Sequence, residues 1–189
     1  MQHVTHYPLG IRLLHWLMAA GITGLIASGW YMAGLDSETA NKYDLYPLHK
    51  SFGVLIILTL IARIALRLLA QRHDKIPAAP AELKVWEKQA SHAAHLSLYA
   101  LMAAVPVSGY VMSGSYEFGH GINFFWTMLP DLVPKAAALF ETAKSLHGPL
   151  AYGLTALVAI HVAAVIKHRA FDAKAADVLP RMLRKSADC

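Results

Sequence analysis

Four histidines lie near the ends of long apolar stretches: His15, His49, His147 and His161. His147 and His161 are fourteen residues apart on one stretch, about four turns of an α-helix, so both imidazoles leave nearly the same helix face. At about 1.5 Å per residue they are roughly 21 Å apart along the axis, which is most of a bilayer core. An ionisable side chain inside lipid is costly and indicates function. Two such imidazoles on one helix, with two more on other stretches, are typical of axial ligands for two haems.

The composition indicates a membrane protein. Of 189 residues, 56% are hydrophobic and only 15% are charged, whereas a soluble domain carries about 25% charged residues. The mean hydropathy is +0.40. The single cysteine, Cys189, excludes a disulfide framework and a c-type haem attachment, so any haem must be held without thioether bonds. The net charge of +5 comes mainly from residues between and after the apolar stretches, which favours a topology signal over nucleic-acid binding.

Four apolar stretches are long enough to cross roughly 30 Å of hydrocarbon as helices of about 20 residues. They cover residues 11–33, 48–69, 92–112 and 147–166. These stretches predict an all-α fold, in which the chain forms an integral membrane four-helix bundle. We expect residues 1–189 to form a single domain. We identify no internal repeat in the sequence.

Lysine and arginine are distributed unevenly between the two sides of this bundle. Thirteen lie on the side of the N-terminal arm, the second-to-third connection and the C-terminal tail, and four lie in the opposite loops. The positive-inside rule therefore predicts that both termini are cytoplasmic, in a bacterial inner membrane. The loop 113–145 is then periplasmic, with an aromatic segment, INFFWTMLP, followed by PKAAALFETAKSL, which we expect to form a short surface helix.

This orientation sorts the histidines by depth. His15 pairs with His161 on the cytoplasmic side, and His49 pairs with His147 on the periplasmic side. Each pair can supply both axial nitrogens of one haem iron, which suits electron transfer rather than oxygen binding. Single histidines at membrane helix ends are more often interfacial. A histidine-lined metal transporter is the other alternative, but it would need carboxylates, and none of the four stretches contains Asp or Glu.

Four segments resemble the bacterial di-haem cytochrome b561 family: LLHWLMA, LHKSFGVLIILTLIARIALR, HAAHLSLYALMAAVPVSGYVMS and SLHGPLAYGLTALVAIHVAAVIKH. The resemblance covers nearly the whole chain and includes the order and spacing of the four histidines. It implies a four-helix bundle with two b haems that passes electrons between a periplasmic donor and the quinone pool. The family is related to the cytochrome b subunits of nickel hydrogenases and formate dehydrogenases. Some members resemble superoxide oxidases, which pass an electron from superoxide to ubiquinone, and a chain with short termini fits that branch.

Three further residues are candidates for binding roles. Arg63 follows His49 by fourteen residues, so it reaches the depth of the cytoplasmic haem, where its guanidinium suits a haem propionate; snorkelling at a helix end is the alternative. The resemblance implies that His95, which matches a family histidine, binds a propionate or lines a proton path. It also implies that His168 contacts the quinone, where an imidazole can relay protons; a solvated helix-end histidine is the alternative.

Lysines near the periplasmic histidines are candidates for attracting a small anion. Lys50 adjoins His49, Lys144 precedes His147 by three residues, and Lys42 lies in the preceding loop. Such a local basic collar can steer superoxide toward the outer haem.

The sequence thus predicts a di-haem b oxidoreductase of the inner membrane, a superoxide:ubiquinone oxidoreductase. The alternative is a haem b anchor and electron-exit subunit for a periplasmic dehydrogenase or hydrogenase. The expected partners are membrane lipid, the quinone pool, and either superoxide or a periplasmic redox protein, with no nucleic acid.

Overall fold

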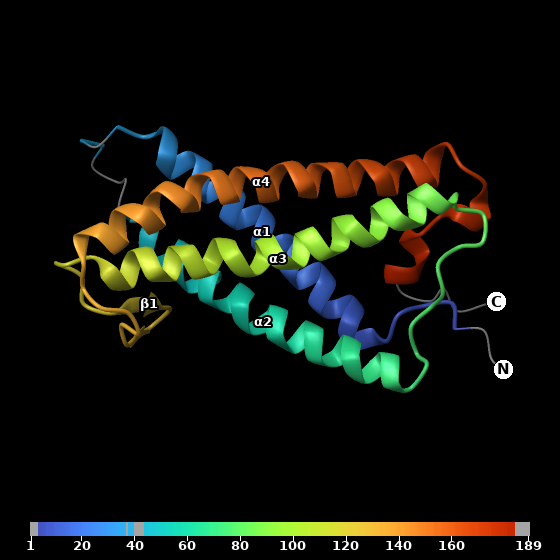
Figure 1. Cartoon of the computed structure of the whole chain (residues 1–189), viewed down its shortest axis with the longest axis horizontal. Helices are drawn as coiled ribbons and strands as arrows, with labels where there is room; N and C mark the ends of the chain where they lie inside the picture. The colour runs from blue at the N-terminus through green and yellow to red at the C-terminus, as the bar shows by residue number, and fades with distance from the viewer. Residues whose placement is uncertain (1–3, 37, 40–43, 184–189) are drawn as a thin grey trace.

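Four long helices make up most of the protein. The computed structural model describes residues 4–36, 38–39 and 44–183. The helices are α1 (Leu9–Gly34), α2 (Tyr46–Arg72), α3 (Val85–Ser115) and α4 (Ala137–Ala170). They form one elongated bundle (Figure 1), and each is long and apolar enough to cross a membrane. The predicted all-α membrane bundle is confirmed.

All four helices extend beyond the predicted spans, and the last two do so by the most. α3 begins at Val85, where the side chain of Glu87 accepts a hydrogen bond from the backbone N–H of Lys84 (3.0 Å) and so caps the first turn. The predicted surface helix in PKAAALFETAKSL was wrong as a separate element, because from Ala137 onward it is the start of α4. This segment is rich in alanine and other good helix formers, so the helix continues through it. The 34 residues of α4 span about 51 Å, more than a bilayer core.

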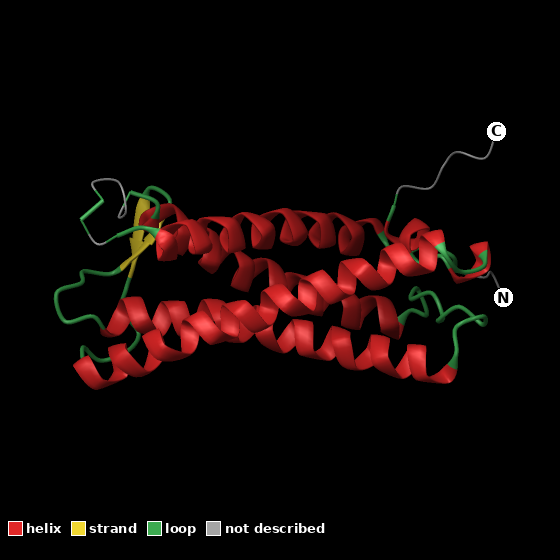
Figure 2. Cartoon of the chain, turned by 90° about the horizontal axis from the view of Figure 1, so that it is seen from above, coloured by secondary structure: helices red, strands yellow, loops and turns green. Residues whose placement is uncertain are grey.

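The connection between α3 and α4 is therefore shorter than the predicted loop, and it contains a β-hairpin. Strands β1 (Ile122–Phe124) and β2 (Thr127–Leu129) pair antiparallel. The hairpin is fastened to α2 by Ser51, which is buried and accepts a hydrogen bond from the backbone N–H of Phe125 (2.7 Å). The aromatic segment thus packs against the end of the bundle opposite the start of α1 and the end of α4 (Figure 2).

A layer of apolar side chains fills the middle of the bundle. Every helix contributes to this central layer, which consists of Met18, Ile22, Ile56, Leu60, Leu98 and Leu154. On α4, which carries a histidine of each pair, Leu154 lies midway in sequence between His147 and His161. Many large apolar side chains instead point outward, as expected where lipid replaces water.

Both ends of the described chain lie at one end of the bundle. The backbone N–H of Tyr7 donates to the carbonyl of Arg181 (3.1 Å), and the indole N–H of Trp16 donates to the carbonyl of Met182 (3.0 Å). Arg181 in turn donates to the carbonyl of Ala78 in the α2–α3 connection (2.5 Å). The three segments predicted to share one side of the membrane therefore meet. Their assignment to the cytoplasm stays a prediction from the charge distribution.

Candidate functional site

The two histidines predicted to lie on the periplasmic side, His49 and His147, are called the outer pair, and His15 and His161 are called the inner pair. The outer pair faces a cavity. His49 on α2 and His147 on α4 have ring centroids 6.5 Å apart and ring planes inclined at 77°. Both line a cavity of about 270 Å³ whose other walls are mostly apolar. Gly29 and Gly109 form part of the wall beside the rings. A Cβ on Gly109 would lie 3.0 Å from Cε1 of His147, and one on Gly29 would lie 3.4 Å from Cε1 of His49.

Each outer imidazole is held by a serine from a neighbouring helix. Nδ1 of His49 lies 2.9 Å from Oγ of Ser28 on α1. Nδ1 of His147 lies 3.0 Å from Oγ of Ser108 on α3 and 3.0 Å from the carbonyl oxygen of Val105. In both rings Nε2 is the nitrogen left for a metal.

The inner pair lies near the other end of the bundle. His15 on α1 and His161 on α4 have ring centroids 6.4 Å apart and planes inclined at 69°. A third imidazole joins them, because the ring of His95 on α3 lies 5.4 Å from that of His161. Nδ1 of His95 is bonded to the carbonyl of Ser91 (2.6 Å), which leaves its Nε2 free to bind another group.

Arg63 lies at the inner pair with its guanidinium buried. Its exposed fraction is 7%, and among the described residues it is the only charged residue that is buried. One nitrogen donates to the carbonyl of Ile11 (2.6 Å). Burying a guanidinium is costly unless an anion accepts its remaining hydrogens, so the position suits a carboxylate ligand.

The spacing of both pairs fits a metal held between two imidazoles. Metal–nitrogen bonds of about 2 Å, with each ring centroid about 1.1 Å beyond its nitrogen, place the two centroids about 6 Å apart. Two rings packed edge to face also occur at centroid distances of about 4.5–7 Å, but the measured 6.4 Å and 6.5 Å equally accommodate a single atom bonded to both rings. The residues present therefore fit two bis-imidazole haem irons, one in each half of the bundle.

Comparison with known proteins agrees with this chemistry. Residues 6–185 match the sequence profile of the family described as prokaryotic cytochrome b561. The chain is also similar to Cytochrome b561 homolog 2 of Escherichia coli (strain K12), at 32% identity over 174 residues, covering 92% of this chain and 88% of that protein. The chain belongs to the prokaryotic cytochrome b561 family. It is thus a multi-pass haem b protein of the bacterial inner membrane that functions in electron transfer.

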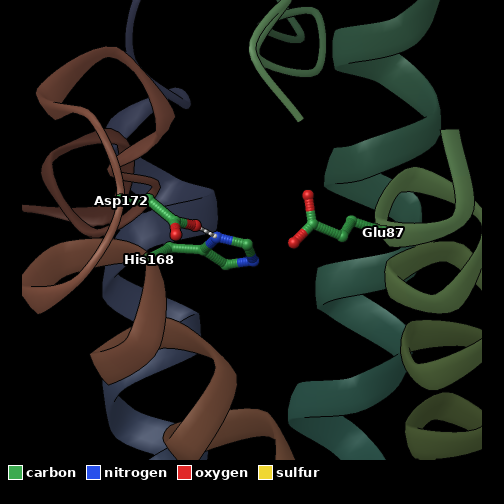
Figure 3. Close-up of side chains that lie close together, drawn as sticks. All are labelled: Glu87, His168 and Asp172. Atoms are coloured by element: carbon green, nitrogen blue, oxygen red, sulfur yellow. Dashed lines mark hydrogen bonds and ion pairs between the residues drawn. The ribbon is translucent and has the colours of Figure 1, made fainter. Parts of the chain in front are cut away.

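At its inner end this cytochrome carries a charged cluster around His168. Glu87, His168 and Asp172 bring their ligand atoms within 4.8 Å of one another (Figure 3). Nδ1 of His168 lies 2.6 Å from Oδ2 of Asp172, and the other ring nitrogen faces Glu87. Lys167 donates to Glu87 (2.6 Å) and to Asp172 (2.9 Å). The lysine ammonium already stands where a metal ion would bind, so the cluster is an ion-pair network.

The pKa of the Asp172 carboxyl lies below its ordinary value. The hydrogen bond from Lys167 is the largest cause, and the hydrogen bond from His168 follows. Asp172 is therefore an anion at neutral pH and holds a hydrogen on Nδ1 of His168. Sequence reasoning missed Asp172 and Glu87, although the spacing of His168 and Asp172 by four residues is a signal for a helix-end pair. No local pattern could show that Glu87 on α3 meets them.

The two candidate lysines at the outer end differ in their surroundings. Lys50 lines the cavity between His49 and His147. Lys144 is exposed, 3.7 Å from Glu141, and it is not among the residues that line this cavity. Lys42 lies outside the described residues. Of the two described lysines, Lys50 is the one placed to meet an anion at the outer pair.

The helices that hold these sites contain an internal repeat, which corrects our sequence analysis. SGWYMAG in α1 and SGYVMSG in α3 begin at Ser28 and Ser108. Each serine follows a histidine of the inner site, His15 or His95, by thirteen residues. The pattern is degenerate and lies in apolar sequence, so it does not stand out in the sequence. The shared role of the two serines in the structure makes it recognisable.

Proposed function

We propose that this cytochrome transfers electrons across the membrane from superoxide on the periplasmic side to ubiquinone on the cytoplasmic side. The observation that carries the proposal is the presence of two histidine pairs, each with the spacing of a bis-imidazole site, at opposite ends of one bundle. Electron transfer between the two membrane surfaces needs a redox centre near each surface, and the bundle has a candidate haem site at each end.

His49 and His147 would hold the outer haem, and His15 and His161 would hold the inner haem. When bound, the two haems would supply reversible one-electron chemistry. Arg63 would bind a propionate of the inner haem, which explains a guanidinium that is buried with only one protein acceptor identified. The ring of His95 has a free Nε2 beside His161 and suits a second propionate or a proton path.

The protein groups around the two sites have separate tasks. The central apolar layer excludes water between the sites and keeps the environment there of low polarity. At the outer site, the ammonium of Lys50 attracts superoxide to the cavity wall. Each superoxide that loses one electron becomes O₂, so the outer site needs no proton donor.

The inner site must supply protons, because ubiquinone takes up two electrons and two protons to become ubiquinol. His168 is the candidate donor. The carboxylate of Asp172 accepts its Nδ1 hydrogen, so the imidazole is fixed in orientation and its other nitrogen can hold a proton for a quinone oxygen. Glu87 faces that nitrogen (Figure 3) and, as a carboxylate paired with Lys167, can accept a hydrogen bond from the protonated imidazole.

A stopped-flow experiment tests the whole proposal. Purified holoprotein is mixed with superoxide and a soluble ubiquinone, and haem reduction and ubiquinol formation are followed together. We expect rapid haem reduction followed by ubiquinol. The variant His168→Gln should slow ubiquinol formation by about a hundredfold or more, typical of losing a general acid, without slowing haem reduction.

The control is His92→Gln, which alters an exposed histidine of α3 at the same end of the bundle. Haem that superoxide does not reduce would contradict the proposed donor. Co-purification with a periplasmic dehydrogenase or hydrogenase, together with absent superoxide activity, would instead support the electron-exit subunit.

A further inference from the structure

We infer that Ser28 and Ser108 are positioning residues that fix the tautomer and ring orientation of the two outer histidines, and through them the redox potential of the outer haem. The inference rests on the proposed ligation by His49 and His147. It does not depend on which donor or quinone the cytochrome uses.

The direction of the hydrogen bond between each serine and its histidine follows from the serine's second partner. That partner is a backbone carbonyl oxygen, which can only accept. The hydroxyl of Ser28 donates to the carbonyl of Leu25 (3.2 Å), and the hydroxyl of Ser108 donates to the carbonyl of Val105 (2.7 Å). Each serine oxygen must then accept from the histidine Nδ1 beside it. The hydrogen is therefore held on Nδ1 in both rings, and Nε2 keeps the lone pair that binds iron.

The internal repeat supports the same conclusion independently. Ser28-Gly29 on α1 and Ser108-Gly109 on α3 occupy matching places, and in each case the serine bonds the ring while the glycine lies against its Cε1. The serine holds one edge of the imidazole, and the missing side chain of the glycine makes room for it. Two helices with the same device, used on two different histidines, indicate a selected arrangement rather than an incidental polar contact.

The two serines are not equivalent, and this difference sharpens the inference. Nδ1 of His147 also lies 3.0 Å from the carbonyl of Val105, so it retains an acceptor when Ser108 loses its hydroxyl. For His49 the serine is the one acceptor identified among the described residues. Removal of the Ser28 hydroxyl should therefore disturb its histidine more than removal of the Ser108 hydroxyl.

The expected direction of the change follows from ligand basicity. An acceptor on Nδ1 makes the imidazole a stronger electron donor through Nε2, which stabilises ferric iron. Loss of that acceptor weakens the donation and raises the midpoint potential. It also releases the ring to rotate away from the 77° between the two imidazole planes, and the electron paramagnetic resonance signal of a low-spin ferric haem is sensitive to this angle.

The test is a redox titration of the purified holoprotein, followed by visible and electron paramagnetic resonance spectra, for Ser28→Ala, Ser108→Ala and Ser28→Thr. We expect the outer potential to rise most in Ser28→Ala and less in Ser108→Ala, and to return toward wild type in Ser28→Thr, which keeps a hydroxyl. The inner haem should not change. The matched control is Thr23→Ala, since Thr23 on α1 donates only to its own helix, at Ala19 (2.8 Å).

Loss of the outer haem from Ser28→Ala but not from Ser28→Thr would also support the inference, because Ser28→Thr keeps the hydroxyl that Ser28→Ala removes. Three results would overturn it: an unchanged outer potential in Ser28→Ala, equal shifts in the two alanine variants, or failure of Ser28→Thr to restore the signal. If His49→Ala kept both haems, the proposed ligation would fail instead, so the two failures are distinguishable.

Discussion

At the scale of single residues, the same side chain serves different purposes in different surroundings. His49 and His147 present a free nitrogen to a cavity and are held from behind by serines. His168 is held by a carboxylate at the edge of the bundle. The inner site adds His95 as a third imidazole. Spacing along the sequence identifies the candidates, and the partner of Nδ1 separates their roles.

Replacement of one outer ligand should remove one haem. We expect His49→Ala and His147→Ala each to lose about half of the haem and to keep the inner centre, because the inner pair lies roughly 21 Å away along α4. Haem content and the reduced visible spectrum measure this. Loss of both haems from either variant would show that the two sites assemble together.

The two glycines beside the outer histidines should differ in their tolerance of a methyl group. Gly109→Ala places Cβ 3.0 Å from the ring of His147, whereas Gly29→Ala places it at an ordinary contact distance of 3.4 Å from the ring of His49. We expect overpacking in Gly109→Ala to destabilise the protein by about 1–3 kcal/mol and to lower outer haem occupancy. Thermal unfolding and haem titration compare the variants, and equal effects would contradict the geometry.

At the scale of elements, the outer end depends on a hairpin that is fastened to a helix. The strands β1 and β2 are short, and their turn places Phe125 at a φ of 51°. Ser51 on α2 donates to the carbonyl of Pro47 (2.7 Å) and accepts from the backbone N–H of Phe125 (2.7 Å). Since Ser51 directly follows His49 and Lys50, the hairpin is held beside the outer site.

Loss of the Ser51 hydroxyl should release the hairpin. Ser51→Ala leaves the N–H of Phe125 without this acceptor, which costs about 1–3 kcal/mol, so its amide should exchange with deuterium roughly tenfold faster or more. Hydrogen exchange at the hairpin measures this. The control is Ser115→Ala, because Ser115 is equally buried but donates only within α3. Unchanged exchange in Ser51→Ala would show that packing alone holds the turn.

At the scale of the whole molecule, the bundle has two chemically different ends. The outer end holds a cavity and a hairpin, and the inner end holds both ends of the described chain and an ion-pair network. Lys167 on α4 joins the start of α3, through Glu87, to the segment that follows α4, through Asp172. The network thus closes the inner end of the bundle around His168.

The stability that the ion-pair network contributes at the inner end should depend on pH in a defined direction. The pKa of Asp172 is lower in the folded protein than its ordinary value, so its contribution to stability is present above the ordinary pKa of about 3.9 and is lost as the pH falls through the lowered value. We expect the Tm of wild type to exceed that of Asp172→Asn at neutral pH, and this difference in Tm to vanish in acid. Glu141→Gln, which removes an exposed pair with Lys144, should show little difference at any pH.

The orientation in the membrane can be tested with the protein's own cysteine. Cys189 is the only cysteine in the sequence and lies outside the described residues. If the charge distribution places the termini in the cytoplasm, an impermeant thiol reagent should label Cys189 in inside-out vesicles and not in intact spheroplasts. The reverse pattern should hold for Leu132→Cys in a Cys189→Ser background, since Leu132 is exposed in the α3–α4 connection at the outer end. Labelling of Cys189 in spheroplasts would invert the assignment.

The sequence by itself determined the number of helices, their membrane character and the histidine pairs. These follow from local quantities: hydropathy over about 20 residues and the 3.6-residue period of a helix. The sequence could not place the start of α4, because an alanine-rich segment beside a membrane is equally compatible with a separate surface helix. Nor could it reveal the repeat, whose pattern is too degenerate to stand out in apolar sequence.

Only the tertiary structure decided which groups face one another across helices. Ser28 meets His49, Ser108 meets His147, and Glu87 meets Lys167 because separate helices pack side by side. Such contacts depend on helix rotation and depth, which residues far apart in the chain set jointly. The sequence therefore established that histidines could hold haem, and the packing decided how each imidazole is held.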